Sequence, residues 1–159
     1  MNNRKVYISG EIVPEADAKI SIFDSAVLLG DTVTESTRTF NYKPFKLDDH
    51  LERLYKSFKL TRIDPQMTIE EMKKVSLELL EINKDNYKAN EDCWLVHNIS
   101  RGHSITGGNP ALQVSKPTVM IYTQPMNLVL WAPFYTKGCH AVTPPTRMVP
   151  SQSLDARIK

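Results

Sequence analysis

The start of the chain carries the polar and apolar alternation that is typical of β-strands. Residues 5–9 and 12–13 flank the pair Gly10-Glu11, and glycine readily takes the positive φ that a two-residue turn requires. This pattern predicts a β-hairpin. Residues 19–23 also alternate polar and apolar side chains, which predicts a short half-buried strand.

A second hairpin is predicted in the next segment. Residues 31–40 are rich in β-branched side chains, which favour strands. Residues 41–44 have the composition of a turn and lead into residues 45–47. We therefore expect two more strands here, joined by that turn.

Two helices follow, because the apolar positions now recur at helical spacing. Asp49 with Glu52, and Thr68 with Glu71, resemble capping boxes at two helix starts. The first apolar stripe comprises Leu47, Leu51, Leu54, Tyr55 and Phe58, and the second comprises Ile69, Met72, Val75, Leu79 and Ile82. Residues 83–86 break the second pattern.

Strands return after the helices. Residues 93–99 and 118–123 are predicted strands, separated by a loop over residues 101–117 that is rich in glycine, proline and asparagine. Strands, two helices and strands again form an α+β order. The sequence therefore predicts a small two-layer α+β domain over residues 1–123.

The composition changes after this unit, where prolines punctuate the chain. We expect an interdomain linker over residues 124–137 and the start of a larger, mainly β domain over residues 138–159, with a short strand at residues 139–143. A segment of roughly 20 residues is too short to bury a core of its own. The second domain is therefore expected to be incomplete in this chain.

The charge of the chain argues against partners that are recognised by charge alone. It has 20 Lys and Arg against 18 Asp and Glu, a formal net charge of +2, with both signs interspersed. Nucleic acid and acidic membranes are therefore not expected as partners. The longest apolar runs, at residues 26–29 and 128–132, are far shorter than the roughly 20 residues of a membrane helix, so we expect a cytoplasmic protein.

The cysteines and histidines favour structural roles over metal binding. Cys93 and Cys139 are far apart and belong to no Cys-x-x-Cys pair, so we expect both to be reduced. The four histidines show no metal-ligand spacing, and no metal site is expected.

The last residue, in Ser153-Leu154-Asp155-Ala156-Arg157-Ile158-Lys159, is a candidate for covalent chemistry. A lysine forms a reversible imine with an aldehyde through its neutral amine, which requires a sheltered site. By itself a terminal lysine means little, because most lysines are solvated. Its significance depends on two other motifs, Gly30-Asp31 with the strand that follows and the helix segment 50–54.

Four motifs resemble, in order and spacing, those of the class IV, or fold type IV, pyridoxal-phosphate aminotransferases. They are residues 6–13 (VYISGEIV), Gly30-Asp31, residues 50–54 (HLERL) and Ile158-Lys159. This family includes branched-chain aminotransferases, D-amino-acid transaminases, (R)-selective amine transaminases and aminodeoxychorismate lyase. The resemblance implies a small α/β domain, a linker, a larger domain that holds most of the cofactor site, and a homodimer.

The resemblance assigns roles to two residues. Lys159 falls where the family has its Schiff-base lysine, which holds pyridoxal 5'-phosphate and then acts as general base and acid. Arg53 falls where the family binds the cofactor phosphate, which suits the paired donors of a guanidinium. On a helical wheel Arg53 lies away from the apolar stripe, which also fits an ordinary solvated arginine. His50, about one turn earlier, is either its partner or a plain surface histidine.

Four further residues are candidates for binding the substrate. Thr34 stands where many relatives carry an aromatic residue that lines the pocket, so this pocket is expected to be more polar or more open. Arg38, on the same strand, either faces the substrate or is an ordinary strand arginine. Arg101 and His103 open the long loop, where they either catch a substrate carboxylate or serve solubility.

The D-amino-acid members place an arginine and a histidine further along this loop. Residues 105–108 (ITGG) occupy that region here, which counts against such a carboxylate trap. The leading hypothesis is a transaminase that moves an amino group from a branched-chain-type amino acid to a 2-oxo acid. The alternatives are a D-amino-acid or (R)-amine transaminase, and a non-catalytic α+β association module or inactive fragment.

Several parts of the family's cofactor site have no counterpart up to Lys159. They are a tyrosine near the cofactor, the glutamate that pairs with the pyridine nitrogen, and the loops that complete the phosphate cup. We therefore expect this chain to be the first part of a longer polypeptide. A free fragment is not expected to catalyse the reaction.

Overall fold

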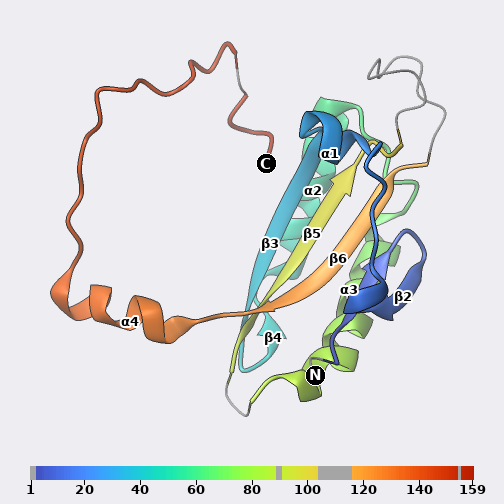
Figure 1. Ribbon diagram of the computed structural model, residues 1–159, viewed down its shortest axis with the longest axis horizontal. Helices are drawn as coiled ribbons and strands as arrows, with labels where there is room; N and C mark the ends of the chain where they lie inside the picture. Colours follow the sequence, from blue (N-terminus) through green and yellow to red (C-terminus); the bar gives the residue numbers. More distant parts are fainter. Residues whose placement is uncertain (1–2, 89–90, 104–115, 154) are drawn as a thin grey trace.

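A single antiparallel sheet forms the centre of the fold. The computed structural model describes residues 3–88, 91–103, 116–153 and 155–159. Within them, six strands pair in the order β2-β1-β6-β5-β3-β4, and each strand runs antiparallel to its neighbours. Figure 1 shows the strands, which are β1 (Lys5–Ile8), β2 (Glu11–Pro14), β3 (Thr32–Phe40), β4 (Lys43–Pro44), β5 (Cys93–Ser100) and β6 (Thr118–Pro125).

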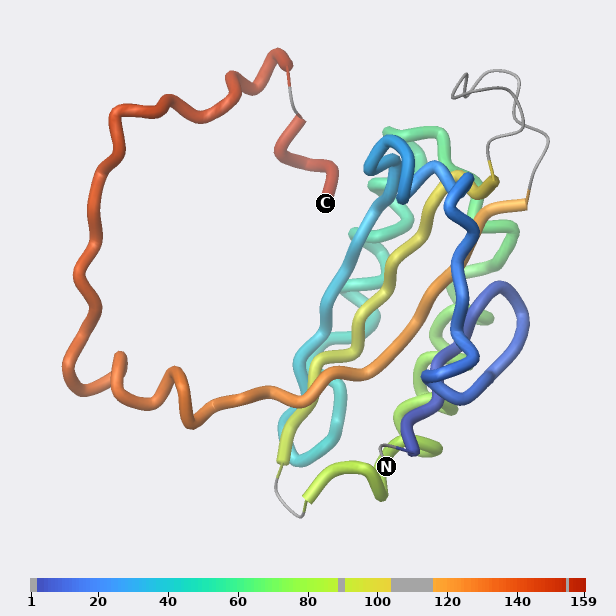
Figure 2. The backbone as a smooth tube through the Cα atoms, in the orientation of Figure 1, coloured from blue at the N-terminus to red at the C-terminus, as the bar shows by residue number. Residues whose placement is uncertain are grey.

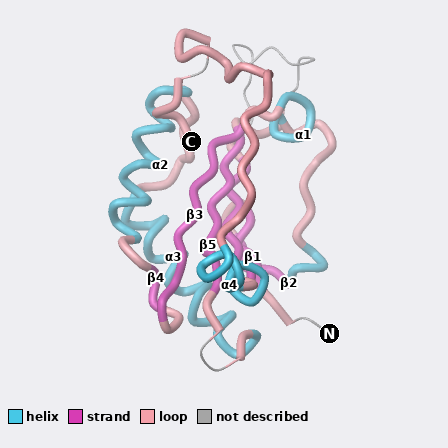
Figure 3. The backbone as a smooth tube through the Cα atoms, turned by 90° about the vertical axis from the view of Figure 1, so that its left-hand side faces the viewer, coloured by secondary structure: helices cyan, strands magenta, loops and turns pink. Residues whose placement is uncertain are grey.

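Two long helices cover one face of this sheet. In Figure 3, α2 and α3 lie side by side along the same side of the strands. The helices are α1 (Ser25–Leu29), α2 (Leu47–Thr61), α3 (Ile69–Asn83) and α4 (Leu128–Lys137), with short 3-10 turns at Glu15–Asp17 and Lys84–Asn86. No helix in the described part of the chain is long and apolar enough to cross a membrane.

The core lies between the helix layer and the sheet. The apolar stripes of α2 and α3 pack against the inward side chains of the strands, and its fully buried members include Leu51, Leu54, Met72, Leu79, Val33, Leu95, Ile99 and Ile121. Burial of each leucine contributes on the order of 2 kcal/mol to folding. The predicted two-layer α+β architecture is confirmed.

The first predicted hairpin is also confirmed. β1 and β2 are joined at Ser9 and Gly10, whose φ angles are 46° and 110°. The strand predicted for residues 19–23 is wrong, because no neighbouring strand pairs with that segment. Its side chains Ile22 and Phe23 are 70% and 54% exposed, so the alternation there does not mark a buried face.

The second hairpin forms with a shorter second strand than predicted. β3 pairs with β4, and Asn41 and Tyr42 turn the chain with φ angles of 48° and 62°. The strand predicted over residues 45–47 is wrong, because the pairing stops at Pro44 and Leu47 already begins α2.

The two long helices begin differently. α3 has the predicted capping box, in which the Thr68 hydroxyl accepts from the Glu71 N–H at 3.2 Å and the Glu71 carboxylate accepts from the Thr68 N–H at 2.8 Å. The capping box predicted for Asp49 and Glu52 is wrong. Lys46 precedes α2 with a φ of 53°, no side chain caps that end, and Asp49 lies in the first turn, where its charge favours the helix dipole.

The short helix α1 has no counterpart among the predicted elements. Asp24 caps its start, with Oδ1 accepting from the Ala26 N–H at 2.8 Å, and Gly30 ends it in the left-handed conformation at a φ of 67°. A helix of 5 residues is too short to show a periodic apolar stripe.

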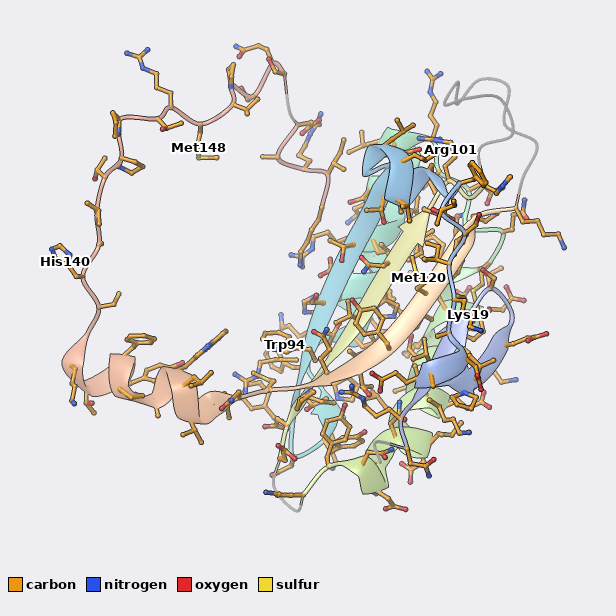
Figure 4. All side chains as sticks on the ribbon, viewed as in Figure 1. Lys19, Trp94, Arg101, Met120, His140 and Met148 are labelled. Carbon is orange, nitrogen blue, oxygen red and sulfur yellow. The ribbon has the colours of Figure 1, made fainter. Side chains whose placement is uncertain are left out.

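The chain leaves the sheet after β6 and returns to it at its last residue. Figure 2 shows the segment that contains α4 and the residues after it as an arc away from the sheet, with the C-terminus back beside β3. His140 and Met148, labelled in Figure 4, lie on this arc, and Met148 is 92% exposed. The segment expected to be a linker therefore contains a helix.

The short strand predicted at residues 139–143 is wrong. The described residues after Pro125 contain no strand. A strand needs a neighbour that supplies hydrogen-bond partners, and no described strand lies against this segment.

Candidate functional site

A buried carboxylate, Glu35, lies at the centre of the candidate site. The burial of β3 alternates, so that Val33, Glu35 and Thr37 face the helix layer while Thr34 and Arg38 lie on the open face of the sheet. Glu35 is 0% exposed. A charge in that position needs partners, because an isolated buried carboxylate is strongly unfavourable.

Three side chains and one backbone group bind this carboxylate. Arg53 of α2 donates from Nε to Oε2 and from Nη2 to Oε1, both at 2.7 Å. Lys159 Nζ lies 2.8 Å from Oε1, and His50 Nδ1 lies 3.0 Å from the same oxygen. The Ser36 N–H donates to Oε1 at 2.9 Å. The cluster therefore joins β3, α2 and the last residue of the chain.

These contacts keep Glu35 ionised. Burial by itself raises the pKa of the carboxyl group, but the hydrogen bonds from Arg53, Lys159 and His50 outweigh burial and lower the pKa of Glu35 to about 2. The pKa of Arg53 is raised in turn, chiefly by its hydrogen bond to Glu35. A fixed negative charge therefore faces two cationic side chains.

Arg53 and Lys159 are held by Glu35 and yet remain accessible. Their side chains are 49% and 42% exposed. Arg53 uses Nε and Nη2 for Glu35, and its Nη2 also lies 3.2 Å from His50 Nδ1. Within the part of the chain that the structure describes, its Nη1 has no hydrogen-bond partner. Arg53 is thus a fixed cation with a donor to spare, rather than a freely solvated helix-surface arginine.

The backbone of Lys159 is anchored to both β3 and α2. Its carbonyl oxygen accepts from the Thr34 N–H at 3.1 Å, and its N–H donates to the Ser57 hydroxyl at 3.3 Å. Ser57 in turn donates to the Arg53 carbonyl at 3.1 Å. Lys159 is 124 positions from Glu35 in sequence, so the fold and not the local sequence brings them together.

A buried histidine lies next to Glu35 within the sheet. His97 on β5 is the register partner of Glu35, and both are 0% exposed. Its Nε2 lies 2.8 Å from the Ser76 Oγ, whose hydroxyl donates to the Met72 carbonyl. Burial lowers the pKa of His97 to about 4, although the charge of Glu35 acts in the opposite direction. His97 is therefore neutral at neutral pH.

Thr34 contacts Lys159, whereas Arg38 has other partners. The Thr34 hydroxyl donates to the His97 carbonyl at 3.2 Å, so it is used within the sheet. Arg38 donates from Nε to a backbone carbonyl at 3.3 Å and lies over the Phe40 ring, with Cζ 3.7 Å from the centroid. Both candidates share the open face, and the described contacts link Thr34 alone to the Glu35 cluster.

Arg101 connects the end of β5 to the end of α2. Its Nε and Nη2 bind the Asp31 carboxylate at 2.8 and 3.2 Å. Its Nη1 donates to the Arg62 carbonyl at 2.8 Å, and its Nη2 to the Thr61 carbonyl at 3.0 Å. The guanidinium thus stabilises the C-terminal carbonyls of α2, which favours a structural role over carboxylate binding.

His103 lies near the start of α1 and not in the Glu35 cluster. It forms an isolated bridge with Asp24, and its ring meets that of Phe23 edge to face at 5.8 Å between centroids. The expected absence of a carboxylate trap concerns residues 105–108, which lie outside the described residues.

Glu35 is absent from the residues that the sequence motifs single out, although a signal for it exists. In the alternation of β3 it shares the face of Val33 and Thr37, so an acidic residue stands at a core position. A buried carboxylate requires a cationic partner, and Arg53 on the next helix supplies one.

Comparison with known proteins identifies the family. The family model described as Amino-transferase class IV matches residues 32–159, a range that includes Glu35, Arg53 and Lys159. A protein of Methanocaldococcus jannaschii, provisionally named a branched-chain-amino-acid aminotransferase, is 36% identical over 155 residues, which is 98% of this chain and 50% of that protein. A D-alanine aminotransferase of Staphylococcus epidermidis is 32% identical over 120 residues, which is 76% of this chain and 41% of that protein.

The fold is shared with solved structures of named aminotransferases. The crystal structure of the branched-chain amino acid aminotransferase of T.th. with pyridoxamine 5'-phosphate has a TM-score of 0.67 and 25% identity. The match covers 79% of this chain and 41% of that chain. This chain therefore spans half or less of the length of these relatives. By its sequence from residue 32 onward and by its fold, the chain belongs to the class IV aminotransferase family.

Proposed function

We propose that this protein is a pyridoxal-phosphate-dependent aminotransferase in which Lys159 binds the cofactor covalently. The observation that carries the proposal is the convergence of Lys159 Nζ and the Arg53 guanidinium on Glu35, at 2.8 and 2.7 Å. A primary amine and a guanidinium side by side suit a ligand that carries both an aldehyde and a phosphate. Membership in the class IV family supports this assignment.

The described residues fit one part of that cofactor. Lys159, with a side chain 42% exposed, offers the amine for the aldehyde. Arg53, with a side chain 49% exposed, offers donors to the phosphate. We propose that the partner of the pyridine nitrogen and the rest of the phosphate site lie in a second domain. The branched-chain amino acid aminotransferase structure that contains pyridoxamine 5'-phosphate supports the choice of cofactor.

The residues of the cluster divide the work of the reaction. When bound, the cofactor supplies an electron sink for the bonding electrons at the substrate Cα. In this proposal Lys159 Nζ takes the proton from Cα and returns it. Arg53 holds the phosphate through charge-assisted hydrogen bonds, and His50 stands beside it. Glu35, whose pKa is about 2, remains ionised and offsets one cationic charge.

We propose a branched-chain-type amino acid as the amino donor and a 2-oxo acid as the acceptor. The Methanocaldococcus jannaschii relative, 36% identical over 98% of this chain, supports this substrate class. A D-amino acid is the second candidate, supported by the D-alanine aminotransferase that is 32% identical over 76% of this chain. A panel of L-amino acids, D-amino acids and (R)-amines, assayed with one 2-oxo acid, separates the two by the stereochemistry of the active donors.

We also propose that residues 138–159 begin a larger cofactor-binding domain, joined by residues 124–137. Large apolar side chains on α4 and beyond are exposed, among them Val129 at 81%, Tyr135 at 84% and Val142 at 78%. So much exposed apolar surface is unusual for a complete domain, which supports a second domain that covers it. The family resemblance supports a cytoplasmic homodimer, and light scattering of the intact protein tests the dimer.

The test of the proposed function is the variant Lys159→Ala. Transamination is expected to be lost while the thermal unfolding of the protein stays near that of the wild type. Lys59→Ala is the matched control, because Lys59 is an exposed lysine on α2 with no role in the cluster. A Lys159→Ala protein that transaminates at a near wild-type rate excludes the proposal and leaves the non-catalytic module as the better description.

A further inference from the structure

Glu35 concentrates more donors than its own ionisation requires. Its Oε1 lies within 3.0 Å of Arg53 Nη2, Lys159 Nζ, His50 Nδ1 and the Ser36 N–H, while Oε2 accepts from Arg53 Nε at 2.7 Å. These donors come from different parts of the chain. A single carboxylate therefore sets the relative positions of the guanidinium and the amine.

Stability alone does not explain a carboxylate at this position. Glu35 is 0% exposed on a face whose other partners include Leu51 and Leu54, and an apolar side chain there is often as stabilising as a buried ion pair. Arg53 and Lys159 are 49% and 42% exposed, and without a fixed partner such long side chains sample many rotamers. The two-point contact with Glu35 fixes the plane of the Arg53 guanidinium.

We propose that Glu35 is the positioning residue of the cofactor site. It orients Arg53 towards the phosphate, and in the cofactor-free protein it holds Lys159 Nζ beside that guanidinium. This inference rests on the proposed function. It goes further by assigning a role to a residue that does not itself touch the cofactor.

The two contacts of Glu35 have opposite consequences for ligand binding. An oriented Arg53 favours any ligand that carries a phosphate. The contact between Lys159 Nζ and Oε1 must open before the amine reaches an aldehyde, because the nitrogen cannot form both contacts at once. During attachment a C=N bond forms, and two protons of the ammonium leave with the aldehyde oxygen as water. Removal of the Glu35 charge therefore weakens the phosphate contact and releases the amine.

Three probes separate these effects in the intact protein stripped of cofactor. Inorganic phosphate, followed by calorimetry, reports on Arg53 alone. Pyridoxal 5'-phosphate, followed by absorbance, reports on both contacts. Pyridoxal, which has the aldehyde without the phosphate, reports on the release of Lys159. The variants are Glu35→Gln, Arg53→Ala and the double variant, with Glu78→Gln as the control, since Glu78 is an exposed carboxylate on α3.

Glu35→Gln is expected to weaken binding of phosphate and of pyridoxal 5'-phosphate by about tenfold or more. The double variant is expected to bind phosphate no more weakly than Arg53→Ala, because Glu35 acts through Arg53. Attachment of pyridoxal is expected to become faster in Glu35→Gln. A merely structural loss slows both aldehydes together and lowers the melting temperature in proportion.

The outcomes distinguish this inference from the proposed function. Opposite changes for pyridoxal and for phosphate support the positioning role. Phosphate affinity of Glu35→Gln within twofold of the wild type, or slower attachment of pyridoxal, overturns it while the role of Arg53 stands. Should Arg53→Ala also keep wild-type phosphate affinity, the phosphate role of Arg53 fails as well. If Glu35→Gln does not fold, Glu35→Asp serves, with intermediate phosphate affinity expected and wild-type affinity contradicting the proposal.

Discussion

The backbone N–H of Thr34 donates a 3.1 Å hydrogen bond to the carbonyl oxygen of Lys159. Because Thr34 directly precedes Glu35 on β3, this bond sets the lysine backbone against the strand that carries its ion-pair partner. Adjacent residues of one strand therefore hold both the backbone and the amine of Lys159. Figures 1 and 3 show the C-terminus beside β3 and α2, where this contact lies.

Replacement of Arg53 by alanine is expected to weaken binding of pyridoxal 5'-phosphate by about 2 to 4 kcal/mol, because charge-assisted contacts to the phosphate are lost. Equilibrium titration of the cofactor-free protein measures the change. Lys56→Ala is the matched control, since Lys56 is a cation on the same helix whose side chain is 73% exposed. Unchanged affinity of Arg53→Ala assigns Arg53 to the solvated helix surface.

Replacement of Arg101 by alanine is expected to lower the free energy of unfolding by about 1 to 3 kcal/mol, because Asp31 and the last carbonyls of α2 lose their partner. Urea unfolding measures this loss. Arg157→Ala is the control, because the Arg157 side chain is 77% exposed. An Arg101→Ala protein with wild-type stability and a raised KM for the amino acid supports substrate binding by Arg101 instead.

Glu35 is expected to make the protein sensitive to acid. The carboxyl has its ordinary pKa of about 4.5 in the unfolded chain and about 2 in the folded protein, so the unfolded chain binds the proton first as the pH falls. The stabilisation is present above about pH 4.5 and is lost as the pH falls towards 2. We expect a loss of about 1 to 3 kcal/mol, limited by the half-exposed partners.

Urea unfolding of the wild type and Glu35→Gln at several pH values tests this expectation. The difference in unfolding free energy between the two proteins should shrink between pH 4.5 and 2, since only the wild type has the carboxyl group. A difference that stays constant over that range contradicts a lowered pKa for Glu35.

His97 is expected to act in a higher pH window. Its pKa is about 4 in the folded protein, against an ordinary value of 6.5 in the unfolded chain, because burial disfavours the charged ring. The unfolded chain therefore binds the proton first, and stability falls as the pH drops from 6.5 to 4. We expect a loss on the order of 3 kcal/mol for the wild type.

The variant His97→Gln is expected to lack that loss, because it has no ring to protonate. The control is His140→Gln, since His140 is exposed on the arc (Figure 4) and a solvated ring has a similar pKa in both states. Parallel pH profiles for the wild type and His97→Gln contradict a buried neutral histidine.

Local signals in the sequence predict the parts of the fold that depend on neighbouring residues. The run of β-branched residues gives β3, and the pair of Thr68 and Glu71 gives the start of α3. The strand prediction for residues 19–23 fails because alternation alone does not supply a partner strand. The same reason explains the missing strand at residues 139–143.

The candidate site depends on contacts that no local pattern contains. A helical wheel shows Arg53 on the polar side of α2, but only the fold shows that Glu35 of β3 meets it there. The convergence of Lys159 on the same carboxylate, 124 positions away, follows from the return of the chain to the edge of the sheet. The family motifs single out Lys159 and Arg53, and the alternation of β3 gives an unused hint of Glu35.

Reduction of the intact protein with borohydride after incubation with pyridoxal 5'-phosphate tests the central claim most directly. Peptide mass analysis is expected to find the reduced cofactor attached to Lys159, and the protein before reduction is expected to be yellow. A colourless protein whose Lys159 carries no adduct contradicts the account.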